Sequence, residues 1–95
     1  MAVIEMLRVR CPQQRHAEFM ARDAVVWTPA LARHDGFISK ETWTSMDDPD
    51  LITLVIHWHS MEQWKSFPAE LCERLDAEMG DLLLPMTCET YEVHE

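Results

Sequence analysis

The sequence predicts an α+β protein with the element order β-α-β-β-α-β, which is the ferredoxin-like arrangement. Segments with a two-residue apolar period alternate with segments of helical period. Proline, glycine or aspartate turns separate these segments from one another. Right-handed crossovers turn this order into a four-stranded antiparallel sheet with both helices on one face. The length of 95 residues predicts a single domain that covers residues 1–95.

The first half of the chain contains a strand, a helix and a second strand. Residues 3–9 alternate in character and predict a strand with Val3, Glu5 and Leu7 on one face and Ile4, Met6 and Arg8 on the other. Residues 13–27 have a helical period, and we expect the Thr28-Pro29 pair to interrupt this helix. A turn at 34–36 leads to a strand over 37–44, in which Phe37, Ser39, Glu41 and Trp43 are expected to share a face.

The second half repeats the pattern of strand, helix and strand. Residues 51–59 are rich in β-formers and predict a central strand covered on both faces. Ser60 and Gln63 have capping-box spacing, which predicts a short helix over 61–67. A second helical segment begins at Pro68 and ends at Gly80, and a last strand covers 86–93.

Composition narrows the classes of partner. The chain has a formal net charge of −9, and phosphate backbones and anionic lipid surfaces repel a negatively charged protein. We therefore expect neither nucleic acid nor membrane as a partner. With 47% apolar residues and four tryptophans, the chain has more apolar surface than a small core hides. We therefore expect a homodimer, and a cytoplasmic location because no targeting segment is recognisable.

Two motifs carry a resemblance to a known family. "HDGF" at 34–37 enters the second strand, and "HWHSMEQW" at 57–64 joins the third strand to the following helix. With this element order, the chain resembles the antibiotic biosynthesis monooxygenase-like proteins over nearly its whole length, and within them a small uncharacterised cyanobacterial branch. The resemblance implies a dimeric α/β barrel whose ligand lies between the sheet and the helices of one monomer. Members of the family include cofactor-free quinone-forming monooxygenases and haem-degrading monooxygenases.

The haem-degrading members use an Asn on the first strand, a Trp at the end of the third and a His on the second helix. Trp58 matches the Trp, but Met6 and Pro68 stand near the other two positions. The resemblance therefore favours chemistry without a cofactor. His57 and His59 have a spacing that can ligate a metal, but they need a third ligand, and we expect no metal site.

Three residues are candidates for chemistry. The resemblance implies that Trp58 is an aromatic wall of the ligand cavity, whereas a large core residue is the simpler interpretation. His16 and Asp23 fall in the apolar stripe of the first helix, where either can act as a general base on an acidic phenol or enol. Alternatively, both lie at the solvent edge of the helix, or Asp23 pairs with Lys40 or an arginine.

The cavity walls follow from the same resemblance and from the apolar stripes. The expected ligand-binding residues are Met6, Phe19, Met20, Trp27, Leu54, Ile56 and Trp64. We expect them to bind a small apolar or aromatic molecule. The alternatives are a non-catalytic ligand-binding or structural dimer with the same fold, and a haem or metal binder.

Overall fold

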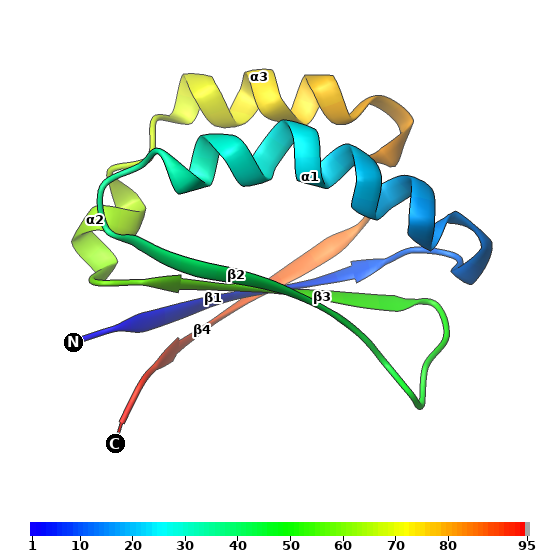
Figure 1. Ribbon diagram of the computed structural model, residues 1–95, viewed down its shortest axis with the longest axis horizontal. Helices are drawn as coiled ribbons and strands as arrows, with labels where there is room; N and C mark the ends of the chain where they lie inside the picture. The colour runs from blue at the N-terminus through cyan, green and yellow to red at the C-terminus, as the bar shows by residue number, and fades with distance from the viewer. Residues whose placement is uncertain (95) are drawn as a thin grey trace.

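The computed structural model describes residues 1–94 and confirms the ferredoxin-like α+β fold. The antiparallel sheet has the order β2-β3-β1-β4, and Figure 1 shows α1 and α3 side by side above one of its faces. None of the helices within the described residues is long and apolar enough to cross a membrane. The strands are β1 (Val3–Arg10), β2 (Phe37–Thr44), β3 (Leu51–Trp58) and β4 (Met86–Glu92), and the α-helices are α1 (His16–Ala32), α2 (Met61–Lys65) and α3 (Ala69–Met79).

Helix α1 passes through Pro29 without a break, so the predicted interruption at this residue is wrong. Proline removes one backbone N–H, which leaves the carbonyl of Val25 without its helical donor. Val25 is 71% exposed, so water can take the place of that donor. The helix continues to Ala32, and the N–H of Arg33 donates to the carbonyl oxygen of Pro29 at 3.3 Å.

Strand β2 contains a β-bulge between Phe37 and Ser39, which the sequence pattern did not predict. In the ladder with β3, Phe37 lies opposite Trp58 and Lys40 lies opposite Ile56. The extra residue places Phe37 and Lys40 on the helix-covered face together, although their separation of three would put them on opposite faces of a regular strand. The expectation that Phe37 shares a face with Glu41 is therefore wrong.

The turn from β3 into α2 has the predicted cap. The Ser60 hydroxyl accepts a hydrogen bond from the backbone N–H of Gln63 at 3.1 Å. Helix α2 ends at Lys65, two residues before the predicted end, and α3 begins directly after Pro68. Gly36 lies close to this turn and has φ +92°, a conformation that favours glycine.

The space between the sheet and the helices is filled by two separate groups of buried side chains. One group contains Val9, Cys11, Phe19, Ile52, Leu54, Met79 and Leu82. The other contains Val3, Leu31, Ile56 and Trp58. This division matters for function, because a cavity between the sheet and helices α1 and α3 takes its walls from both groups.

Candidate functional site

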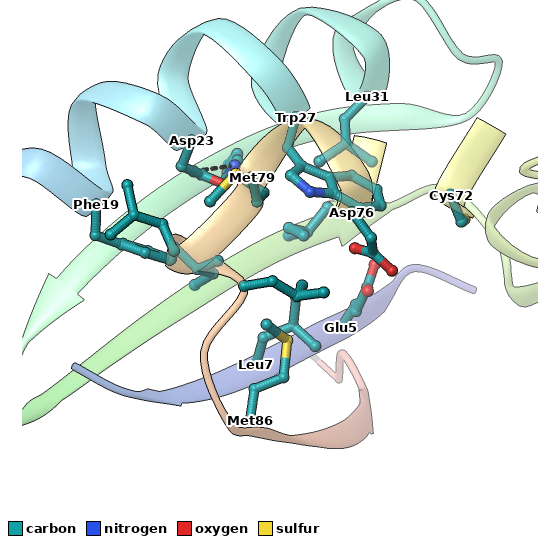
Figure 2. A pocket seen from close by; sticks show the side chains of 15 residues that line it. Glu5, Leu7, Phe19, Asp23, Trp27, Leu31, Cys72, Asp76, Met79 and Met86 are labelled. Atoms are coloured by element: carbon teal, nitrogen blue, oxygen red, sulfur yellow. Dashed lines mark hydrogen bonds and ion pairs between the residues drawn. The ribbon is translucent and has the colours of Figure 1, made fainter. Parts of the chain in front are cut away.

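The candidate site is a cavity of about 250 Å³ between the sheet and helices α1 and α3 (Figure 2). Its volume is just below the range of about 300–1,000 Å³ that is usual for small-molecule sites. Leu83 and Met86 are each more than 40% exposed and form part of its rim. The lining residues are Glu5, Leu7, Phe19, Asp23, Trp27, Leu31, Lys40, Leu54, Ile56, Cys72, Asp76, Met79, Leu82, Leu83 and Met86.

A buried ion pair forms one part of the cavity wall. Lys40 Nζ lies 2.5 Å from Asp23 Oδ2, and the two side chains are 5% and 7% exposed, respectively. Lys40 also donates to the hydroxyl of Thr28 at 3.0 Å. The pair joins α1 to β2, and its charges compensate each other, as burial of an ion pair requires. Three interpretations were open for Asp23: a general base, a residue at the solvent edge of the helix, and a partner in an ion pair. The structure supports the pair with Lys40.

A carboxyl group on β1 faces the cavity from the sheet. Glu5 lies opposite Ile56 in the ladder, and its Oε1 accepts a hydrogen bond from the indole N–H of Trp58 at 3.1 Å. Burial raises the pKa of Glu5, and the hydrogen bond from Trp58 opposes this increase without cancelling it. A carboxylate with a raised pKa is a stronger base than glutamate in water.

A second carboxyl group faces the cavity from α3. Figure 2 shows the carboxyl groups of Asp76 and Glu5 pointing toward one another. Burial also raises the pKa of Asp76, and it raises the pKa of the neighbouring Cys72 thiol. The cavity therefore holds two carboxyl groups that gain protons more readily than usual, among mainly apolar walls.

Trp58 and Trp64 line an adjoining hollow at the α2 end of the cavity. The indole of Trp58 is completely buried and makes edge-on contacts with the rings of His34 and Phe37, at centroid distances of 5.8 and 6.0 Å. These contacts fix the plane of the ring, and hence the direction of the N–H that holds Glu5. The hollow shares Glu5, Trp27, Leu31 and Cys72 with the main cavity.

Five of the residues expected from the sequence lie in the wall of the main cavity: Phe19, Asp23, Trp27, Leu54 and Ile56. Helix α1 contributes three of them and β3 contributes two. Trp58 and Trp64 are separated from this group and lie in the adjoining hollow. The structure thus places these residues of the helix and of the sheet in one cavity wall.

Three expected residues do not line the cavity. Met6 is on the other face of the sheet, where its sulfur lies 3.8 Å from a guanidinium nitrogen of Arg8. Met20 is 36% exposed, next to the buried Phe19. The His16 ring is hydrogen-bonded through Nε2 to the carbonyl oxygen of Cys11 at 2.9 Å, because a 3₁₀ turn precedes α1 and makes His16 the first residue of the helix. These positions correct the expected placement of all three.

The histidines do not form a metal or haem site in this cavity. Within residues 1–94, no group of three or more His, Cys, Asp or Glu side chains is placed to hold a metal ion. His57 lies opposite Ile4 and faces away from the helices, whereas Glu5 faces them. Glu5 therefore cannot be the third ligand that His57 and His59 would need. The lining residues include no imidazole that could be an axial ligand of haem.

Glu5, Cys72 and Asp76 line the cavity but were not proposed as site residues. Glu5 could have been found once the covered face of β1 was known, because it lies between Val3 and Leu7 in the alternation. Cys72 and Asp76 are spaced by four on α3 and therefore share a helix face. A partly polar stripe beside the apolar stripe of this helix is the sequence signal that could have identified Cys72 and Asp76 as cavity residues.

Several solved structures resemble this chain. A proposed antibiotic biosynthesis monooxygenase from Bordetella bronchiseptica is 18% identical, with a TM-score of 0.81 over 99% of this chain and 98% of the other. A second from Caulobacter crescentus is 14% identical, with a TM-score of 0.79 over 99% and 91%. A variant of SnoaB, a cofactor-independent oxygenase from Streptomyces nogalater, is 15% identical, with a TM-score of 0.75 over 99% and 94%.

Comparison with protein-family models gives no match, and neither does comparison with curated proteins. At these sequence identities, the solved structures establish a shared fold. The chain therefore has the open-sheet α+β fold of the antibiotic biosynthesis monooxygenases. To that fold the site adds a partly apolar cavity with two carboxyl groups and a buried ion pair.

Proposed function

We propose that this chain is a monooxygenase-like protein that binds a small apolar or aromatic molecule between its sheet and helices. The observation that supports the proposal is the cavity, whose walls combine aliphatic side chains with Trp27 and few polar groups. Such a site favours a flat apolar molecule with a limited number of hydrogen-bonding groups. Membership of the monooxygenase-like family, including its cyanobacterial branch, is part of this proposal.

The reaction that fits the cavity is oxygenation without a cofactor. A base removes a proton from an electron-rich ring, and the resulting carbanion passes electrons to dioxygen. When a ring CH₂ group becomes a carbonyl, one oxygen atom enters the product and the other leaves as water. Positioning and the exclusion of water supply most of the catalysis in such a mechanism. The base belongs among the residues that face the cavity, which His16 does not.

The activity is tested by oxygen uptake with 1-naphthol and other one- and two-ring hydroxyarenes in aerated buffer. We expect one dioxygen consumed for each quinone formed, at a rate proportional to protein concentration and abolished by heat denaturation. Binding of these compounds without oxygen uptake would instead support a non-catalytic ligand-binding protein of the same fold. Absence of both binding and uptake would overturn the proposed function.

The uncovered face of the sheet supports a homodimer. Figure 1 shows both long helices on one side of the sheet and none on the other. Trp43 and Tyr91 are 48% and 42% exposed, and their ladder partners Thr53 and Ile4 place them on this open face. A second copy of the sheet would cover these aromatic rings. Sedimentation at micromolar concentration tests the proposal, and a monomer there would overturn it.

A further inference from the structure

The carboxyl group of Glu5 is held from one side only. The indole N–H of Trp58 binds Oε1, and no other hydrogen bond to Glu5 is present within residues 1–94. Because Trp58 is fully buried and fixed between His34 and Phe37, its N–H defines where the carboxyl group lies. The second oxygen, Oε2, remains free to accept a hydrogen bond from a molecule in the cavity.

The other strongly polar wall of the cavity is already neutralised. Lys40 donates to both Asp23 and Thr28, so this cluster satisfies its own hydrogen bonds. Within residues 1–94, no cationic side chain is in contact with Glu5 or Asp76 in a comparable way. The polar groups of the cavity that remain available are therefore hydrogen-bond acceptors. A ligand with a hydrogen-bond donor complements them.

Charge and size narrow the class of ligand. Two carboxyl groups disfavour a ligand carboxylate by repulsion, and an ammonium ion would lose its hydration among apolar walls. A cavity of about 250 Å³ holds one or two fused rings better than a larger polycycle. A neutral hydroxyarene satisfies all three conditions, because its ring fits the walls and its hydroxyl group donates to the free carboxyl oxygen.

We propose that Glu5 accepts the hydroxyl proton of a one- or two-ring hydroxyarene bound in this cavity, and that Trp58 is the positioning residue for Glu5. In the transfer, the ligand O–H bond breaks and its electron pair stays on the ligand oxygen. The proton forms a new O–H bond with Oε2 of Glu5, so no oxidant or reductant is required. This inference rests on the proposed ligand-binding function and assigns its base.

The electrostatic surroundings make the proton transfer dependent on pH. Burial raises the pKa of Glu5, so its carboxylate is present above that raised value and is lost below it. The preference of the cavity for a ligand with a hydroxyl group should follow the titration of Glu5, since a neutral carboxyl group is a weaker hydrogen-bond acceptor than a carboxylate. The titratable and charged groups around Glu5 are Asp23 on α1, Lys40 on β2, Lys65 on α2, Cys72, Glu73 and Asp76 on α3, and Cys88 on β4.

Calorimetric titration with 1-naphthol and naphthalene tests the assignment. A hydrogen bond to a charged acceptor predicts that 1-naphthol binds the wild-type chain about tenfold or more tightly than naphthalene. Glu5→Gln should remove most of this preference while keeping naphthalene affinity, and its amide oxygen can still accept from Trp58. Glu70→Gln is the matched control, because Glu70 is exposed on α3 and lies outside the cavity wall. It should retain the preference.

Two more variants separate positioning from folding. Glu5→Asp retracts the carboxyl group and should weaken the preference without removing its pH dependence. Trp58→Phe removes the N–H that lowers the pKa of Glu5, so the midpoint of the pH profile should move upward. A purely structural role of Trp58 would leave that midpoint unchanged.

The possible outcomes are distinct. If neither naphthalene nor 1-naphthol binds, the proposed function itself fails. If both compounds bind equally, or if Glu5→Gln keeps the preference for 1-naphthol, the proposed ligand-binding function is retained but the role of Glu5 is refuted. Tighter binding of 1-naphthylmethylammonium than of 1-naphthol would also refute it, because the carboxyl groups would then act as a cation site.

Discussion

Replacement of Lys40 by methionine should destabilise the fold strongly, because it leaves a buried carboxylate without its cation. The Lys40 and Asp23 side chains are 5% and 7% exposed, so water can replace very little of the lost interaction. Breaking a buried pair by removing one partner costs about 3–5 kcal/mol. For a chain of this size, each kcal/mol lowers Tm by roughly 4–8 °C, so the expected loss is at least ~12 °C.

The assay is urea unfolding at neutral pH and fixed protein concentration, followed by tryptophan fluorescence. The double variant Lys40→Met with Asp23→Leu removes both charges and should recover most of the lost stability, because apolar replacements of a buried pair are often neutral or better. Arg10→Met is the control. Arg10 and Asp48 are also 2.5 Å apart, but their side chains are 61% and 37% exposed. This loss should stay below about 1 kcal/mol.

Two results would refute this reasoning. A cost below about 1 kcal/mol for Lys40→Met would show that the pair contributes no more than an exposed pair does. A double variant no more stable than Lys40→Met would show that the unpaired charge of Asp23 is not the cause of the loss.

Four further predictions concern other parts of the molecule. Since burial raises the pKa of Glu5, its contribution to stability is complete below the ordinary value of 4.5 and is lost as pH rises through the raised value. Glu5→Gln should therefore be more stable than wild type at neutral pH and similar in acid, as thermal unfolding across pH would show. Ser60→Ala removes the cap of α2 and should cost about 1 kcal/mol in urea unfolding. Gly36→Ala should cost about 1–3 kcal/mol, because the residue has φ +92° and its added Cβ would lie 2.5 Å from the Cβ of Gln63; unchanged stability would contradict the turn geometry. Trp43→Lys should shift sedimentation from dimer to monomer without changing 1-naphthol binding, and an unchanged dimer would place the interface elsewhere.

The fold could be predicted because period, turns and caps agree along the chain. The apolar residues of β3 and the Ser60 cap each indicate one local structure, and the structure has both. Right-handed crossovers then leave few topologies open. Helix α1 is the exception, since no local pattern shows that an exposed residue one turn before Pro29 permits the helix to continue.

The site was less predictable because its residues depend on which face is covered. Both faces of β1 contain apolar residues, so alternation alone could not decide between Met6 and Glu5 as the cavity residue. A helical wheel gives the direction of His16 around the helix axis but not its position along the axis. His16 is the first residue of α1, directly after the 3₁₀ turn over Gln13–Arg15, and its ring is hydrogen-bonded to the carbonyl oxygen of Cys11. Phe19 and Trp27 lie farther from this irregular start, and their predicted placement agrees with the structure.

The bulge in β2 makes the length of this segment as important as its composition. If residues 37–40 paired with β3 as a regular strand, without the bulge, their separation of three would let only one of Phe37 and Lys40 face the helices. If Phe37 stayed against Trp58, Lys40 would turn to the open face and abandon Asp23. If Lys40 stayed, Phe37 would leave the ring that positions Glu5. Deleting the one extra residue would instead leave these two side chains two positions apart, on the same face of a regular strand. We therefore expect related chains with a similar cavity to have either this bulge or a segment that is one residue shorter.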